Sequence, residues 1–496
     1  MSFMPGLLSA IVFLPLAGAV VVPVASRLRP GAAKWIALVV AAAGLAMTVA
    51  LIAGFDLSAT GMQAVTNASW VEQAGIRYHL GVDGISLTML ALSSLLGLIA
   101  VIASWKVTER APAYFAMLLL LQVGMNGVFV ALDFVLFYVF WELVLVPMFF
   151  LIGMWGGARR EYASVKFFIY TLAGSVFMLI GIIALYLSAG TFDMVELAAK
   201  GASGAFGLGF QNWVFLAFFL GFAVKVPVWP LHTWLPDAHV EAPTAASVLL
   251  AGVLLKMGTY GFIRVSLPML PQATVAWAPW IAVLAVISIV YGAAVAFAQT
   301  DLKKLVAYSS VSHMGFVMLG IFSLTAAGLN GAVAVMFSHG VVTGMLFLIV
   351  GIVYDRAHTR EIAKIGGLSV AMPVTGGLLA FAAFASLGLP GLSGFVGEFL
   401  SLVGSWQSAV IPQWVTMIAA VGVLLAAAYT LWMVLRVVLG TPTEAVLGLP
   451  DASAREIGML APLIALTLVV GVWWSSLLGY VDPAVRALVA VVTKAV

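Results

Sequence analysis

Residues 213–264 read WVFLAFFLGFAVKVPVWPLHTWLPDAHVEAPTAASVLLAGVLLKMGTYGFIR and are the most informative part of this chain. Two apolar segments in this stretch each carry one lysine, Lys225 and Lys256, and a run with four prolines separates them. An ammonium group at membrane depth costs roughly 2.5–3.5 kcal/mol even on a lenient insertion scale. Proline beside such a charge frees backbone carbonyls, which are tolerated only against protein or a water-filled cavity. The stretch therefore predicts a proton path within a membrane.

The composition of the whole chain indicates a polytopic membrane protein. Of its 496 residues, 64% are hydrophobic and only 8% are charged, whereas soluble globular chains carry about 25% charged residues. The pI of 9.0 does not indicate nucleic-acid binding, because the basic residues are not clustered. The chain has no cysteine, which excludes disulfides and thiolate-bound zinc or iron–sulfur sites. Its first apolar run has no basic region before it, so we expect a spanning helix there and not a cleaved signal peptide.

Apolar stretches long enough to cross a bilayer, about 20 residues each, recur fourteen times. The stretch 370–404 is long for one span and contains LGLPGLSGF, so we expect a broken helix there. The predicted fold is an all-α polytopic membrane protein with about fourteen transmembrane helices. They are expected near 4–24, 35–55, 83–104, 112–131, 134–153, 164–188, 211–231, 243–264, 275–298, 304–324, 329–353, 370–404, 412–437 and 457–479.

The basic residues are distributed unequally between alternate loops. Fourteen spans place both termini on one side, and the loops of the other side then hold fifteen of the 22 lysines and arginines. Because cytoplasmic loops carry an excess of Lys and Arg, we expect that side in the cytoplasm and both termini on the periplasmic side of a bacterial inner membrane. The smaller set, expected outside, is Arg77, Lys200, Arg264, Arg486 and Lys494.

Interrupted helices occupy corresponding positions in two halves of the chain. The Glu142 helix is followed by the Pro-interrupted helix of Lys225, and the His339 helix by LGLPGLSGFVGEFL with Glu398. Such pairs indicate a transporter's site at the membrane midplane. The interruptions lie five helices apart, and an odd offset reverses orientation, so we expect two inverted five-helix repeats with two broken helices. The expected regions are 1–111 (helices 1–3), 112–264 (helices 4–8), 265–440 (helices 9–13) and 441–496 (helix 14).

Three ionisable side chains in the first half are candidates for proton transfer. Glu142 is either a neutral, hydrogen-bonded carboxyl or a partner of Lys225; a pair that opens and closes would switch the lysine's affinity for its proton. Lys225 and Lys256 could instead extend toward an interface. Both follow a long run of apolar residues, and a desolvated ammonium can be tuned to release its proton, so a proton-carrying role is favoured.

Further candidates lie in the second half and between the lysines. His313 and His339 are either hydrogen-bonded core residues or a relay among neighbouring serines and threonines. Glu398 follows a glycine-rich stretch and either caps a half-helix or ends the proton path. His232 and His239 are expected near the cytoplasmic mouth, where they either serve proton uptake or cap a helix.

The sequence does not favour a metal or phosphate site. No His-rich or paired-carboxylate spacing converges near Glu398, and the glycine-rich stretch lacks the GxxxxGK[ST] spacing. The 15 tryptophans fit interfacial anchoring better than a cofactor role. The remaining histidines, His79 and His358, are interpreted as solvated loop residues.

Five segments resemble the antiporter-like membrane subunits of respiratory complex I, and the resemblance covers nearly the whole chain. They are HLGVDGISLTMLAL (79–92), WELVLVPMF (141–149), KVPVWPLHTWLPDAHVEAPTAASVLLAGVLLKMGTYG (225–261), DLKKLVAYSSVSHMG (301–315) and LPGLSGFVGEF (389–399).

In that family two inverted five-helix repeats form half-channels. The resemblance implies that NADH, FMN, iron–sulfur clusters and quinone are bound by other subunits, with no cofactor and no redox chemistry in this chain. The implied site residues are Glu142 and Lys225 as a modulating pair, Lys256 as central carrier, His313 and His339 as connectors, and Glu398 as outward terminus.

Glu398 distinguishes types within the family. The resemblance implies glutamate here in the M type (the mitochondrial chain 4 type), whereas the L and N types and Mrp-type antiporter subunits usually have lysine. It therefore implies an M-type subunit of a proton-translocating NADH:quinone oxidoreductase. The expected partners are L- and N-type subunits and phospholipids, with no nucleic acid. A subunit of an Mrp-type cation/proton antiporter or of a related membrane-bound hydrogenase is the alternative.

Overall fold

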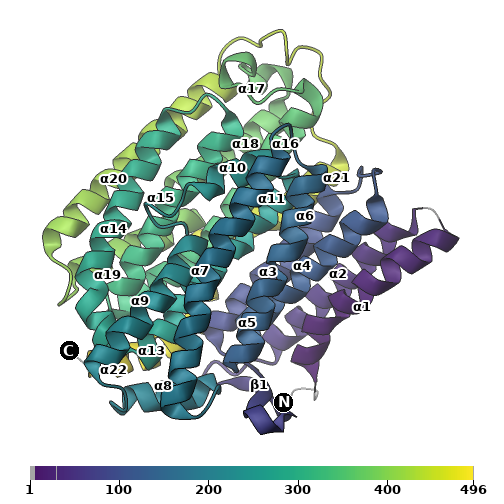
Figure 1. Ribbon diagram of the computed structural model, residues 1–496. Coiled ribbons are helices and arrows are strands. Elements are labelled where there is room, and N and C mark those ends of the chain that lie inside the picture. Colours follow the sequence, from purple (N-terminus) through teal and green to yellow (C-terminus); the bar gives the residue numbers. More distant parts are fainter. Residues whose placement is uncertain (1–5, 30, 495–496) are drawn as a thin grey trace. The chain divides into compact units, whose positions relative to one another are not determined.

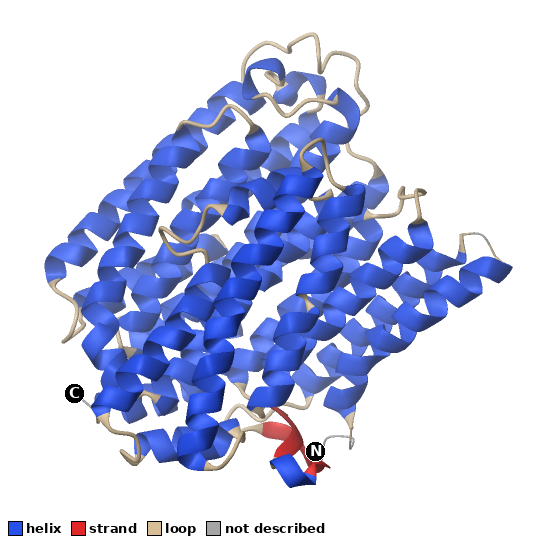
Figure 2. Ribbon diagram, in the orientation of Figure 1, coloured by secondary structure: helices blue, strands red, loops and turns tan. Residues whose placement is uncertain are grey.

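The computed structural model describes residues 6–29 and 31–494, which form helices and one hairpin (Figure 1, Figure 2). The start of the first predicted helix, at residue 4, lies outside these residues. The helices are α1 Leu7–Leu28, α2 Ala32–Ala53, α3 Gly84–Ala103, α4 Ala111–Val130, α5 Phe134–Leu143, α6 Leu145–Trp155, α7 Arg160–Ala189, α8 Met194–Ala202, α9 Leu208–Lys225, α10 Trp234–Glu241, α11 Thr244–Leu249, α12 Leu255–Gly261, α13 Leu267–Met269, α14 Pro271–Phe297, α15 Leu302–Phe322, α16 Ala326–Ala357, α17 Leu368–Ala371, α18 Pro373–Leu387, α19 Ser393–Trp406, α20 Gln413–Met433, α21 Ala454–Val472 and α22 Ser475–Thr493.

The chain divides into two compact units. In the first, α1 packs against α2 and α4, and α7 packs along α9. In the second, α16 is the central helix, buried along most of its length and in contact with α15, α18 and α19. The first unit comprises Met1–Val226, Val253–Ala278 and Gly479–Val496, and the second comprises Pro227–Gly252 and Pro279–Leu478.

The predicted fold class is confirmed. Among the described residues, 14 helices are long and apolar enough to cross a membrane, and all but α22 overlap predicted spans. The predicted span 370–404 has no counterpart among these 14 helices, because it consists of the shorter helices α18 and α19. The inverted relation between the two halves stays a prediction.

The helix α22 was not predicted. The expected last helix, 457–479, runs past the end of α21 at Val472. In the first unit, the Tyr480 ring of α22 lies 6.1 Å from that of Phe55, and its carbonyl fills the space that a side chain at position 84 would need. Figure 1 shows α22 at the same end of this unit as α8 and β1. The helix is amphipathic, with Val485 buried and Arg486 exposed.

A β-hairpin also lies between the predicted spans 35–55 and 83–104. Strand β1 (Gln63–Val71) pairs antiparallel with β2 (Ile76–Val82). The turn between them ends at Gly75, whose φ of 66° favours glycine. The inner end of β2, from His79 to Val82, is buried. Short strands of this kind carry a weak sequence signal in a chain dominated by long apolar helices.

Aspartate side chains begin four of the helices. Each accepts hydrogen bonds from the backbone N–H groups two and three residues later. Such an N-cap contributes about 1 kcal/mol and fixes where the helix starts. The caps are Asp83 for α3, Asp133 for α5, Asp193 for α8 and Asp301 for α15.

The first interruption lies earlier than predicted. The helix expected at 211–231 ends at Lys225, and the chain continues in turns to α10. Pro227 and Pro230 have no N–H to donate, so the α-helical pattern cannot continue through them. In the second unit, the N–H of Trp229 donates instead to Ser288 Oγ at 3.0 Å. Lys225 is therefore the last residue of a helix and does not lie inside a span that continues to residue 231.

The second interruption confirms the predicted broken helix. Between α18 and α19, Gly388 and Gly391 have φ values of 80° and 93°, which favour glycine. Gly394, in the first turn of α19, lies so close to α18 that a Cβ there would overlap the Ala385 carbonyl oxygen. The glycines thus permit both the turn and the close approach of the two half-helices.

Replacing Gly394 with alanine is expected to destabilise the protein by about 1–3 kcal/mol, because the added methyl group must displace backbone. Gly377→Ala is the matched control, since nothing lies within 4 Å of a Cβ at that exposed position of α18. The thermal stability of the purified assembly would be compared for the two variants. Equal stability would show that the break tolerates a side chain at Gly394.

Candidate functional site

Lys225 is enclosed in the first unit. Its side chain is buried, and its Nζ lies 4.9 Å from the centre of the Trp141 ring. In the described part of the chain, Nζ has no hydrogen-bond partner. The carboxyl end of α9 carries the negative end of the helix dipole, which favours a cation there. The ammonium is thus held by an aromatic face and a helix end, both weaker than a direct ion pair.

Glu142 lies on α5, next to Trp141. α5 ends at Leu143, where Pro147 cannot donate the hydrogen bond that would continue the helix. The negative charge of Glu142 acts on Lys225, yet among the described residues the two form no ion pair within 4.0 Å, and Glu142 Oε1 is buried without a hydrogen-bond partner. The predicted pair is therefore in electrostatic range but not in contact.

Lys256 is fully buried on α12. The helix α12 packs closely on α9: a Cβ at Gly258 would lie 2.7 Å from the Phe222 carbonyl oxygen, and one at Gly261 would meet the Phe222 ring. π-helical segments, Leu250–Leu254 and Phe262–Ser266, flank α12. The sequence predicted one regular helix here, and π segments of this kind are frequent at functional sites.

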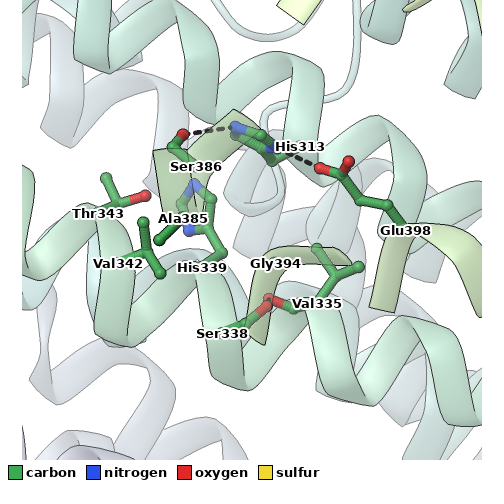
Figure 3. A pocket seen from close by; sticks show the side chains of 10 residues that line it. All are labelled: His313, Val335, Ser338, His339, Val342, Thr343, Ala385, Ser386, Gly394 and Glu398. Carbon is green, nitrogen blue, oxygen red and sulfur yellow. Dashed lines mark hydrogen bonds and ion pairs between the residues drawn. The ribbon is translucent and has the colours of Figure 1, made fainter. Parts of the chain in front are cut away.

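The second unit brings His313, His339 and Glu398 together. His313 Nδ1 lies 2.7 Å from Glu398 Oε1, and its Nε2 lies 3.2 Å from Ser386 Oγ. The rings of His313 and His339 are 5.6 Å apart. Figure 3 shows the imidazole of His313 between Ser386 and Glu398. The sequence predicted the three titratable groups but not Ser386, which carries no signal of its own among many serines.

A small cavity joins these side chains. It is lined by both histidines, Glu398, Ser338 and Thr343, among others (Figure 3), and leaves about 10 Å³ for the centre of a water molecule. That is roughly the minimum that one water requires, and the lining offers the two or more polar partners that such a water needs. The arrangement can therefore pass a proton between the histidines and the carboxyl through one water.

Tyr429 is a further member that the sequence did not indicate. Its hydroxyl lies 3.5 Å from His313 Nε2, and its side chain is buried. It comes from α20, more than a hundred residues away in sequence, so no local pattern could have identified it. A phenol hydroxyl can donate and accept hydrogen bonds, which makes Tyr429 a polar partner on the far side of the imidazole.

The histidines between the two lysines are both buried in the second unit. His239 stacks on Phe347 with a centroid distance of 4.6 Å, and the His232 ring lies 5.1 Å from that of Tyr291. Lys303, which lies just before the predicted span 304–324, is also buried, and its Nζ donates to the Ala242 carbonyl at 2.6 Å. The lysine therefore binds the backbone just after α10, where a cation interacts favourably with the negative end of the helix dipole.

A buried ion pair in the first unit was missed. Arg264 was predicted in an outer loop, but the helical stretch continues to Met269, and Arg264 Nη2 lies 2.6 Å from Asp83 Oδ2. Arg264 Nε donates to Tyr260 Oη, which donates to the Phe129 carbonyl, both at 3.0 Å. Burial raises the pKa of Asp83, but Arg264 and hydrogen bonds at the start of α3 lower it further, to below its ordinary value.

The interpretation of His79 as solvated is wrong. Strand β2 places its side chain in a buried position, with Nδ1 2.7 Å from Asp193 Oδ2. Burial raises the pKa of Asp193, but the hydrogen bonds from His79 and from the first turn of α8 outweigh this and lower the pKa below its ordinary value. The pair therefore ties α8 to the hairpin.

Comparison with known proteins relates the chain to one family. The family model described as NADH:quinone oxidoreductase/Mrp antiporter, TM, matches residues 131–427. NADH-quinone oxidoreductase subunit M of Rhodobacter capsulatus is 48% identical over 501 residues, which is 98% of this chain and 97% of that protein.

Solved structures agree with this. A chain of respiratory complex I from Thermus thermophilus with bound NADH matches with a TM-score of 0.89 and 31% identity, over 98% of this chain and 99% of that chain. A chain of the membrane-bound sulfane sulfur reductase, an archaeal respiratory membrane complex, matches with a TM-score of 0.83 and 26% identity, over 93% and 75%.

Proposed function

The chain belongs to the family of NADH-quinone oxidoreductase M subunits, and we propose that it carries protons across the bacterial inner membrane while neighbouring subunits reduce quinone with NADH. It is a multi-pass membrane protein and a subunit of an enzyme complex. The translocase step is this chain's part of the reaction, and the redox chemistry belongs to other subunits. The resemblance to the M type that Glu398 implied agrees with this family.

One observation carries the proposal: Lys225 is buried, without a hydrogen-bond partner in the described part of the chain, and in the field of a Glu142 that it does not touch. Closing this pair would stabilise the ammonium, and opening it would favour release of its proton, because an opposite charge nearby favours the charged form. Energy from a neighbouring subunit needs only to shift the population of the two arrangements. Lys225 would then pass its proton to the buried Lys256.

In the second unit, His313, His339 and Glu398 would carry the proton onward. The histidines offer groups that titrate near neutral pH, and the cavity between them has room for one bridging water. Glu398 would be the last protonatable group on the outward side. Tyr429 and Ser386 would orient the His313 imidazole by hydrogen bonds.

The neighbours and the orientation follow from the same proposal. L- and N-type antiporter-like subunits would flank this chain, with phospholipids on its remaining apolar faces. The basic loops would face the cytoplasm and both termini the periplasm. The helix α22, which lies at the end of the first unit near α8 and the hairpin, would rest on the periplasmic surface, which leaves this orientation unchanged.

The test is Lys225→Ala in membrane vesicles, with NADH-driven quinone reduction and acidification as readouts. Both rates are expected to fall to below about a tenth of the wild-type value, as for loss of a general acid–base group. Lys200→Ala is the matched control, because Lys200 is a partly exposed lysine paired with Glu196 on α8 of the same unit. A native gel checks assembly.

Wild-type rates in an assembled Lys225→Ala complex would contradict the proposal. The family model also covers Mrp antiporters, so cation/proton exchange in liposomes without NADH would then be measured. Exchange that survives without NADH would identify a cation/proton antiporter activity.

A further inference from the structure

The first unit contains a charged cluster that the proposed proton path does not use. Asp83 Oδ1 accepts hydrogen bonds from the N–H groups of Ile85 and Ser86, which leaves Oδ2 to the guanidinium of Arg264. The side chains of Asp83 and Arg264 are only 8% and 13% exposed. Because a guanidinium stays charged at every physiological pH, its charge here is balanced by Asp83, the acidic side chain that contacts it in the described part of the chain.

Arg264 lies on the same helical stretch as Lys256. Lys256, Tyr260 and Arg264 follow one another at intervals of four residues, and the hydrogen bond between Tyr260 and Arg264 shows that these two share a face. At a rise of 1.5 Å per residue, Arg264 is about 12 Å from Lys256 along the axis. The fixed cation and the proton-carrying lysine are therefore close enough to interact through a buried region.

The other charged groups near Lys256 in the first unit are few. The helix α9, which packs on α12, carries Lys225, and Glu142 acts on Lys225. The helix α4, which also contacts α12, has no charged residue between Ala111 and Val130. Asp83 is thus the group that prevents Arg264 from adding a second positive charge beside Lys256.

We infer that Asp83 and Arg264 are a positioning pair for Lys256: Asp83 neutralises the guanidinium, and Arg264 with Tyr260 fastens the end of the lysine's helix to α3 and α4. The inference rests on the proposed role of Lys256 as a proton carrier. With an effective dielectric constant of about 20, an uncompensated charge 12 Å away moves a titration by about one pH unit. Removal of Asp83 and removal of Arg264 therefore have opposite signs.

The test compares Asp83→Asn, Arg264→Gln and the double variant in vesicles, with NADH-driven acidification measured against pH. In Asp83→Asn the guanidinium repels the Lys256 ammonium, so the alkaline limb of the pH profile moves to lower pH by about one unit. In Arg264→Gln the Asp83 carboxylate attracts the ammonium, and the alkaline limb moves to higher pH. In the double variant both charges are gone, and the limb returns to its wild-type position.

Damage to the fold cannot produce this pattern, because it would lower the activity of both single variants without moving their alkaline limbs in opposite directions. Asp482→Asn is the matched control, since the Asp482–Arg486 pair on α22 has an exposed arginine, and its limb should stay in place. A limb that stays in place in Arg264→Gln, or that stays displaced in the double variant, overturns the inference. This holds even when Asp83→Asn does not assemble on a native gel.

Lys256→Ala distinguishes failure of the proposed function from failure of the positioning role of Asp83 and Arg264. If that variant pumps normally, the proposed function itself fails. If it is inactive while the profiles of Arg264→Gln and the double variant match the wild type, the proposed function stands and only the positioning role of Asp83 is lost.

Discussion

Lys256→Ala is expected to lower NADH-driven acidification to below about a tenth of the wild-type rate in assembled complex. The side chain is fully buried, and its helix is seated on the backbone of α9 at Gly258. The alanine side chain has no group that can accept a proton from Lys225. Vesicle acidification and quinone reduction would be measured together, because a coupled carrier should limit both.

Lys256→Arg is the informative companion to this variant. Arginine keeps the positive charge and most of the volume, but it does not release its proton in proteins. If Lys256 carries protons, the arginine variant should be as inactive as the alanine variant. Activity near the wild-type level in Lys256→Arg would mean that the position needs only a cation.

Glu398→Gln is expected to have a similarly large effect on pumping, with a rate below about a tenth of wild type. The amide keeps the shape of the side chain and an oxygen for the hydrogen bond with His313, but it cannot take up a proton. Since hydrogen bonds to charged groups are worth about 1.5–3 kcal/mol, stability should fall by no more than that. The acidification rate and the thermal stability of the purified complex would be measured in parallel.

Glu398→Asp is the control that keeps the carboxyl group but shortens the side chain. The shorter carboxylate remains protonatable but is drawn away from His313 Nδ1, which is 2.7 Å from Glu398 in the native protein. We expect pumping between that of the wild type and that of Glu398→Gln. Normal pumping by Glu398→Gln would remove Glu398 from the proton path and leave it a structural partner of His313.

The membrane fold could be predicted from the sequence because it depends on local properties. Apolar length alone locates the spans, and the glycines around Gly391 mark the broken helix because their backbone angles exclude most other residues. Intramembrane charge likewise singles out Lys225 and Glu398, since each is costly without a use. These signals need no knowledge of which helices touch.

The contacts of the site could not be predicted for the opposite reason. Tyr429 and Ser386 reach His313 from distant helices, and neither residue type is rare in this chain. Arg264 was misplaced because the end of a helix that continues in π form has no clear sequence signal. The spacing of Lys256, Tyr260 and Arg264 is visible in the sequence. The role of Arg264 at this spacing becomes clear only from its ion pair with Asp83.

Because of the π segment Phe262–Ser266, the number of residues in this stretch is as important as their identity. A π turn holds one residue more than the corresponding α turn, so the chain can lose one residue here and still form continuous helix. Such a deletion would convert the segment to regular α-helix and would leave everything beyond it close to its present orientation relative to Lys256. The π segment is therefore where this stretch can lose a residue, whereas a deletion within α12, between Lys256 and Gly261, would turn everything beyond it by about 100°.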